Sequence, residues 1–121
     1  MAPELIKGQG YDTKVDIWSF GILAMELTNG DPPYIYDHQA AILQKIVMND
    51  PPPIREKWSK TFQDFVNCCL VKDPKGRPSA DVLLEHEFLA GADDYKQEFI
   101  QVVKDYKRIR LAKKKIEETM L

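Results

Sequence analysis

The sequence predicts an all-α fold built from short helices joined by turns. Apolar residues recur at helical spacing in every long segment, and no segment shows the alternating pattern of a strand. Proline and glycine clusters such as residues 30–33 and 50–53 separate these segments. A chain of 121 residues buries roughly two-thirds of its unfolded surface when compact, so it is long enough for a hydrophobic core.

The first long helix is expected over residues 14–28. Its apolar residues are too dense to form one stripe, which predicts a helix buried on most sides. Asp12 or Thr13 is expected to cap its start, and Asn29-Gly30 to end it. The apolar set is Val15, Ile17, Trp18, Phe20, Ile22, Leu23, Met25 and Leu27.

Three shorter helices are expected next. An amphipathic helix spans residues 38–48 and stops at the prolines of 51–53. Ser59 begins another, which the turn at 73–76 ends, and Ser79 caps a third. Their apolar faces carry Ile42, Leu43, Ile46 and Val47; Phe62, Phe65, Val66, Cys69 and Leu70; and Val82, Leu83 and Leu84.

Residues 91–94 are expected to form a junction between a domain at 1–92 and a helical tail at 93–121. Apolar residues then recur at alternating spacings of four and three, which indicates a heptad seam. We expect this seam to pack against a partner helix, along residues 95–120, or against the rest of the chain. Pairing with a second copy of the same helix is less favoured. The seam positions are Tyr95, Phe99, Val102, Tyr106, Ile109, Lys113, Ile116 and Met120.

The basic residues of the tail limit the kinds of partner that this segment can bind. Residues 104–115 hold seven Lys or Arg residues and one acid, Asp105, while the whole chain has a net charge of −2. A solvated helix face explains such a run most simply, and an acidic protein or anionic lipid is the alternative. No nucleic-acid partner is expected, because no aromatic residues interleave on the basic face.

No apolar run approaches the roughly 18 residues of a membrane-spanning helix, and the start of the chain lacks the pattern of a signal peptide. We therefore expect no transmembrane segment and a cytoplasmic location.

Five motifs follow one another in order. Ala2-Pro3-Glu4 comes first, and the helix opening Lys14–Gly21 comes second. The remaining three are Gly30-Asp31-Pro32-Pro33-Tyr34, Cys69–Ser79 and His86-Glu87-Phe88-Leu89. In this order they resemble the lower half of the C-terminal lobe of eukaryotic Ser/Thr protein kinases, most closely the STE group with its PAK-like enzymes. The resemblance covers roughly residues 1–90.

The resemblance implies structural roles for several residues. Glu4 and Arg77 match positions that form a buried ion pair at the end of the activation segment, for which the planar guanidinium is suited. Asp16 matches an aspartate that holds the backbone of the catalytic loop. Leu23 and Leu27 match positions beneath the hydrophobic column that contacts adenine.

Substrate recognition is implied for three further residues. Glu26 matches a glutamate that contacts a basic residue of the peptide in arginine-preferring kinases; the alternative is a side chain that simply reaches solvent. Pro33 and Tyr34 match a loop that often serves as a docking surface.

No catalytic, cofactor-binding or metal-binding residue is predicted in these 121 residues. The Gly-rich phosphate loop, the strand lysine, the catalytic loop and the metal-binding Asp-Phe-Gly do not occur, so ATP and Mg are expected only in the intact kinase. Residues 8–13 lack the third glycine of a phosphate loop and are expected as a turn. His38 and His86 are expected to lack neighbouring ligands, and Cys68 and Cys69 to be reduced thiols.

Two functions follow from this pattern. The chain is either part of a Ser/Thr kinase, inactive by itself, or a truncated non-catalytic kinase-like protein that binds a partner. Tyrosine specificity is a weaker alternative, because the motifs at 30–34 and 73–78 are more typical of Ser/Thr enzymes.

Overall fold

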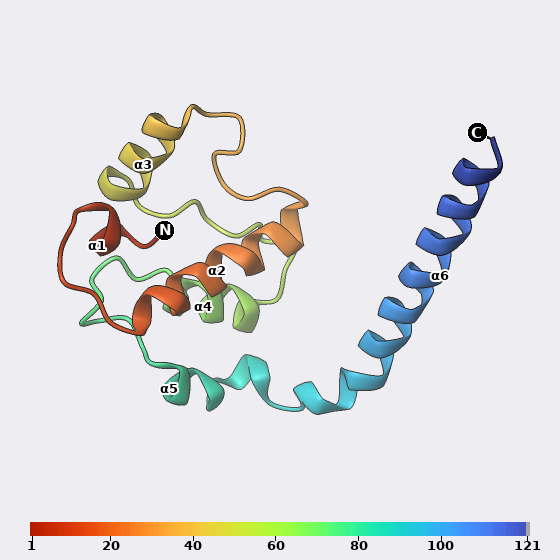
Figure 1. Cartoon of the computed structure of the whole chain (residues 1–121). Helices are drawn as coiled ribbons and strands as arrows, with labels where there is room; N and C mark the ends of the chain where they lie inside the picture. The colour runs from red at the N-terminus through yellow and green to blue at the C-terminus, as the bar shows by residue number, and fades with distance from the viewer. Residues whose placement is uncertain (121) are drawn as a thin grey trace. The chain divides into compact units, whose positions relative to one another are not determined.

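The computed structural model describes residues 1–120, which form six α-helices, two 3-10 turns and no strand (Figure 1). The prediction of an all-α chain is confirmed for this part. The α-helices are α1 Pro3–Ile6, α2 Lys14–Asn29, α3 Gln39–Met48, α4 Lys60–Cys69, α5 Ala80–Leu84 and α6 Lys96–Met120. The 3-10 turns are η1 Glu87–Leu89 and η2 Ala92–Tyr95.

The chain divides into two compact units, Met1–Phe88 and Leu89–Leu121. The first holds α1 to α5, and the second holds η2 and α6. The boundary that we placed after residue 92 lies inside the second unit and stays a prediction.

The core of the first unit lies between α2 and α4, which pack side by side (Figure 1). Gly21 lets the two helices approach, since a Cβ atom at this position would lie 2.7 Å from the Cβ atom of Cys69. Phe65 is buried on α4, and its ring meets the ring of Phe20 edge-on at 6.1 Å. The buried apolar residues of the first unit are Ala2, Trp18, Met25, Ile54, Phe65, Val66, Cys69, Leu70 and Leu83.

Side-chain caps explain where several helices begin. The hydroxyls of Ser59 and Ser79 accept hydrogen bonds from backbone amides in the first turns of α4 and α5. Of the two caps expected for α2, Thr13 is not the one that forms, because its backbone is already helical and its side chain makes no capping bond. Asp12 takes this role instead, with Oδ1 accepting from the Lys14 amide at 2.8 Å.

The prediction that α2 is buried on most sides is also wrong. Trp18, Gly21 and Met25 are buried, whereas Leu23 is 47% exposed and Leu27 is 78% exposed. The physical reason is that within residues 1–88 the main helix contact of α2 is with α4, on the side that carries Gly21. Gly30, with a φ of 86°, ends the helix in the left-handed conformation that favours glycine.

The second unit is dominated by α6, a helix of 25 residues with no buried side chain. None of the helices in residues 1–120 is both long and apolar enough to cross a membrane.

Candidate functional site: a buried ion pair and a surface pocket

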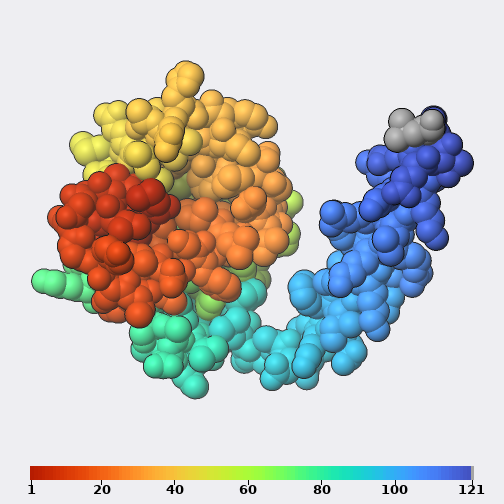
Figure 2. All heavy atoms as spheres, in the orientation of Figure 1, coloured from red at the N-terminus to blue at the C-terminus, as the bar shows by residue number. Residues whose placement is uncertain are grey.

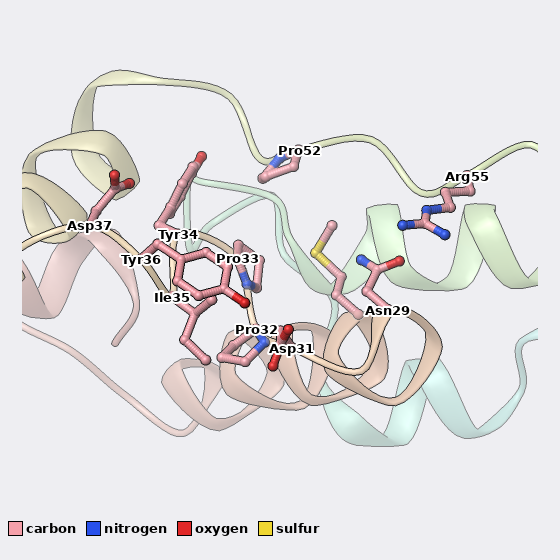
Figure 3. A pocket seen from close by; sticks show the side chains of 11 residues that line it. Asn29, Asp31, Pro32, Pro33, Tyr34, Ile35, Tyr36, Asp37, Pro52 and Arg55 are labelled. Atoms are coloured by element: carbon pink, nitrogen blue, oxygen red, sulfur yellow. The ribbon is translucent and has the colours of Figure 1, made fainter.

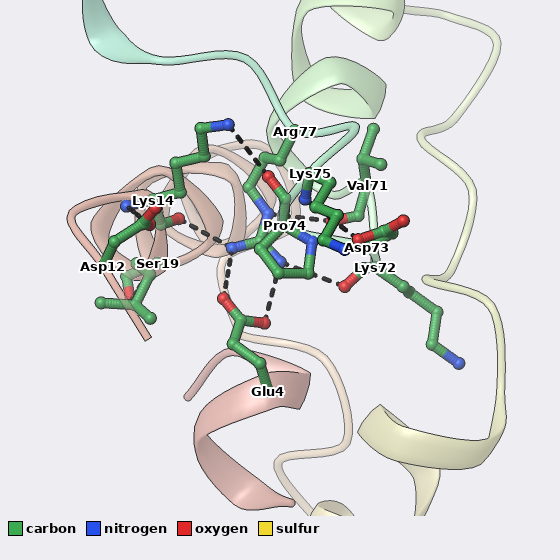
Figure 4. Close-up of polar contacts among 11 residues, drawn as sticks. Glu4, Asp12, Lys14, Ser19, Val71, Lys72, Asp73, Pro74, Lys75 and Arg77 are labelled. Atoms are coloured by element: carbon green, nitrogen blue, oxygen red, sulfur yellow. Dashed lines mark hydrogen bonds and ion pairs between the residues drawn. The ribbon is translucent and has the colours of Figure 1, made fainter. Parts of the chain in front are cut away.

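The structure brings Glu4 of α1 and Arg77 of the loop before α5 into direct contact (Figure 4). Nη1 of Arg77 lies 2.8 Å from Oε1 of Glu4, and Nη2 lies 3.1 Å from Oε2. The Glu4 side chain is 2% exposed and that of Arg77 is fully buried. This bidentate geometry joins two residues that are 73 positions apart in the sequence.

Arg77 uses every donor that a guanidinium offers. Besides the two bonds to Glu4, it donates to the carbonyls of Val71, Lys14 and Lys72 at 2.8, 2.8 and 3.3 Å. Its guanidinium carbon also lies 5.3 Å from the centre of the Trp18 ring. Arg77 therefore ties α1, the start of α2 and the loop after α4 to one point.

The environment of Glu4 favours its charged form. The hydrogen bond from Arg77 lowers the pKa of the Glu4 carboxyl below its ordinary value, and burial opposes this effect without cancelling it. Such a buried pair is costly to break, because removal of one partner leaves the other charge without compensation.

Further bonds hold the loop that carries Arg77. Nζ of Lys14 donates to the carbonyl of Pro74 at 3.0 Å, across 60 positions of sequence. Oδ1 of Asp73 accepts from the Lys75 amide at 3.0 Å, and the Asp73 carbonyl accepts from the amides of Gly76 and Arg77. These bonds fix the turn, so Arg77 enters the core in one direction.

Asp16 and Glu26 lie elsewhere on α2. Asp16 is exposed in the first turn, and Glu26 is half-buried near the end of the helix. Neither side chain makes a hydrogen bond or an ion pair with another described residue. The structure therefore joins neither of them to Glu4 and Arg77.

Pro33 and Tyr34 line a pocket of about 460 Å³ at the end of α2 (Figure 3). Lys45 of α3 holds this loop: Nζ lies 2.7 Å from Oδ2 of Asp37 and 5.3 Å from the centre of the Tyr34 ring. Tyr34 has a φ of 64°, an uncommon value for a residue other than glycine. The pocket presents carboxylates, proline rings and an exposed tyrosine, Tyr36.

Sequence reasoning missed the other residues of this pocket. Pro52 and Arg55 belong to the segment after α3, and only the folded chain brings them beside the end of α2. Part of the signal was visible, because Asp31 and Pro32 belong to the same motif as Pro33 and Tyr34.

The expectation that His86 lacks neighbouring ligand atoms is wrong. Asp64, Cys68 and His86 offer donor atoms within 4.8 Å of one another. However, Nδ1 of His86 accepts a hydrogen bond from the Phe88 amide at 3.0 Å, which leaves the proton of the neutral ring on Nε2, 2.7 Å from Asp64. A histidine ligand normally donates from the nitrogen that does not bind metal, so this arrangement does not suit metal binding.

Both cysteines are free thiols, and neither is activated. Burial raises the pKa of the Cys69 thiol to about 11, and burial also raises the pKa of Cys68. The thiolate is the reactive form of cysteine, and a raised pKa keeps both side chains protonated. The two cysteines therefore fit a role in packing and not one as nucleophiles.

Comparison of the sequence with known proteins shows which family this chain belongs to. Residues 1–89 match the protein kinase domain. Over 94 residues, 76% of this chain, the sequence is 51% identical to the Ser/Thr-protein kinase pakB of Dictyostelium discoideum and 49% identical to the Ser/Thr-protein kinase hippo of Drosophila melanogaster. It is 47% identical to the Ser/Thr-protein kinase cst-1 of Caenorhabditis briggsae over the same share. The matched segment covers 11%, 14% and 19% of the lengths of these three relatives.

Proposed function

Because this chain belongs to the protein kinase domain family, we propose that it is part of an enzyme that transfers the γ-phosphoryl group of ATP to Ser or Thr hydroxyls of proteins. Within that enzyme, residues 1–92 form the lower part of the C-terminal lobe, of the STE group and PAK-like. The buried contact between Glu4 and Arg77 carries this proposal.

The contact between Glu4 and Arg77 suits an activation segment, whose position in a kinase controls the access of substrate. Glu4 belongs to Ala2-Pro3-Glu4, and in a kinase the activation segment ends at this triplet. Arg77 fixes the triplet to α2 and to the loop after α4, both of which belong to the folded core. In the proposed enzyme, the end of the activation segment is therefore held in a fixed position on the folded core.

The free side chains of α2 support a role in substrate recognition. Glu26 is half-buried and has no partner among the described residues, so its carboxylate is available to a basic residue of a bound peptide. The pocket at Pro33 and Tyr34 offers a second contact surface for a protein substrate or regulator. Asp16 is likewise free to accept bonds from a catalytic loop.

The residues of this chain do not fit ATP or Mg. No Gly-rich loop, catalytic loop or Asp-Phe-Gly occurs in the sequence, so we assign no residue here to the nucleotide or the metal. In an intact kinase those groups supply the transferred phosphoryl and the charge that stabilises it.

The mass and activity of the natural protein test this proposal. We would purify it with an antibody against residues 96–120, map its peptides, and assay phosphorylation of Ser- and Thr-containing peptides with ATP. We expect a species well above 14.0 kDa with catalytic-loop peptides and Ser/Thr kinase activity. A purification from cells without the gene controls for contaminating kinases.

A species of 14.0 kDa that neither binds ATP nor phosphorylates peptides would overturn the proposal. It would favour the second candidate, a non-catalytic kinase-like module that binds proteins. The exposed apolar side chains of α6 and the pocket at the end of α2 support that candidate.

A further inference from the structure

The chain holds two histidines, and the fold treats them differently. His86 stands directly before η1, and its Nδ1 accepts a hydrogen bond from the Phe88 amide at 3.0 Å. Its Nε2 lies 2.7 Å from Oδ2 of Asp64 on α4. His38 stands before α3 in the same way, but its side chain makes no capping bond to that helix. Only His86 therefore uses a ring nitrogen to hold a backbone amide.

The bond to the Phe88 amide caps the start of η1. The first amides of a helix have no partner within the helix, so a side-chain acceptor at the preceding position commonly binds one of them. His86 occupies this position, although Ser, Thr, Asp and Asn are the usual capping residues. A hydroxyl or amide oxygen accepts at any ordinary pH, whereas a ring nitrogen that has bound a proton can only donate. This cap therefore exists only while the ring is neutral.

The capped turn places Phe88 against α4. The centre of the Phe88 ring lies 5.1 Å from that of Phe62 and 5.4 Å from that of Phe65. Phe65 also meets the His86 ring edge-on at 5.2 Å. Phe88 is the last residue of the first unit, and the match to the protein kinase domain ends one residue later. The His86 cap thus holds the end of this domain.

The titratable groups that face the ring come from α4. The Asp64 side chain is 70% exposed, so its ion pair with a protonated His86 would be an exposed one, and such pairs contribute little to stability. Cys68 lies beside both groups and stays a neutral thiol, because burial raises its pKa. In the segment of His86 itself, Glu85 and Glu87 are exposed. Protonation therefore removes a bond to the backbone and gains an exposed ion pair in return.

Protons from solvent can reach this ring. The segment from α5 to η1, teal in Figure 2, lies at the surface of the first unit. The side chain of His86 is 15% exposed. Histidine is the residue whose charge ordinarily changes between about pH 5 and pH 8, where most other side chains keep their charge.

We propose that His86 is a pH-sensitive switch at the end of the first unit. With a neutral ring, Nδ1 caps η1 and Phe88 is held against α4. When a proton binds Nδ1, the Phe88 amide loses its acceptor and η1 loosens, while His86 stays beside Asp64 as an ion pair. The switch concerns the fold of this chain and not phosphoryl transfer, so it does not depend on the proposed function.

Nuclear magnetic resonance of the full 121-residue chain tests the switch. The nitrogen shifts of the His86 ring at pH 8 should show a proton on Nε2 and none on Nδ1. Exchange of the Phe88 amide with solvent would then be followed from pH 8 to pH 5 and corrected for the intrinsic effect of pH on exchange. The protection of this amide should fall about fivefold or more, which is the size expected for the loss of one helix cap.

Matched variants separate the switch from a general effect of acid. The side-chain oxygen of asparagine can cap a helix in place of Nδ1, and asparagine does not titrate. His86→Asn should therefore keep the Phe88 amide protected at both pH values, and His86→Ala should leave it unprotected at both. His38→Asn, at the other histidine, is the control and should respond to pH like the parent.

Three results would overturn the proposal. Equal protection of the Phe88 amide at pH 8 and pH 5 in the parent would mean that the cap does not depend on the charge of the ring. A fall of the same size in His86→Asn would assign the effect to other groups, such as the carboxylates. A proton on Nδ1 of the neutral His86 ring would remove the acceptor, and this measurement decides the question on the parent chain even if a variant does not fold.

Discussion

Arg77 offers a test at the scale of a single residue, because its five donors are all engaged. We expect Arg77→Lys to lower the free energy of unfolding by about 3 kcal/mol, since lysine keeps the charge but loses the planar fork. Thermal melts followed by circular dichroism would measure the change. Arg55→Lys, at an exposed arginine, is the matched control and should melt like the parent. If Arg77→Lys melts no earlier, the buried pair does not stabilise the chain.

The same pair predicts a dependence of stability on pH. The folded pKa of Glu4 is lowered from its ordinary value of 4.5, so the stability contributed by Glu4 is complete above that value. It is lost as the pH falls through the lower folded pKa. Between pH 7 and pH 3 the melting temperature of the parent should therefore fall further than that of Glu4→Gln. Parallel curves for the two proteins would contradict this expectation.

Glu26 distinguishes substrate recognition from simple exposure to solvent. In the intact kinase, Glu26→Gln should reduce kcat/KM for arginine-containing peptides about tenfold, because a hydrogen bond between charged groups loses one charge. Peptides without arginine should be unaffected. Glu56→Gln, at an exposed acid outside the pocket, serves as the control. An unchanged preference for arginine would remove Glu26 from the site.

At the scale of elements, the contact between α2 and α4 depends on one missing side chain. Gly→Ala in a helix normally stabilises by about 0.5–1 kcal/mol. At Gly21, however, the added Cβ would lie 2.7 Å from the Cβ atom of Cys69 and 2.8 Å from Cδ2 of Leu70. We expect Gly21→Ala to lower the melting temperature and Ser19→Ala, at an exposed position of α2, to leave it equal or higher. If the Gly21→Ala chain is as stable as the parent, then α2 and α4 can move apart without a loss in free energy of unfolding, and their close approach does not depend on this glycine.

Local signals were enough to predict most helices but not the way in which they meet. The 3.6-residue period, the serines before α4 and α5 and the glycine after α2 each act within one turn, so they are visible in the sequence. Thr13 does not act as a cap because its backbone is already helical, whereas a capping residue normally has an extended backbone. The grouping of Asp64, Cys68 and His86 depends on tertiary packing between α4 and the loop after α5, which no local pattern reports.

For the candidate site, the motifs indicate which residues matter, and the folded structure shows which groups hold them in place. Glu4 and Arg77 stood out through their motifs, whereas the carbonyls of Lys14, Val71 and Lys72 that complete the site carry no signal in their side chains. In the pocket, Pro52 and Arg55 come from a segment without a recognisable pattern. Backbone acceptors and distant loop residues are the parts that need a three-dimensional structure.

At the scale of the whole molecule, the exposed apolar side chains of α2 determine whether the isolated chain aggregates. Leu23 and Leu27 are 47% and 78% exposed, although α2 otherwise forms the core of the first unit. By resemblance, these leucines lie beneath the hydrophobic column of an intact kinase domain, where other elements cover them. Exposed apolar patches of this kind promote association.

We therefore expect the isolated 121-residue chain to bind the dye ANS and to aggregate on heating. Leu27→Lys should reduce both effects without lowering the melting temperature, because Leu27 has little packing to lose. Leu84→Lys, at a 68% exposed leucine of α5, controls for the added charge and should reduce them less. Dye fluorescence and light scattering during thermal melts would measure the difference. A sharp, reversible melt of the parent without dye binding would mean that the open side of α2 needs no cover, and the link between this surface and a larger kinase domain would lose its physical basis.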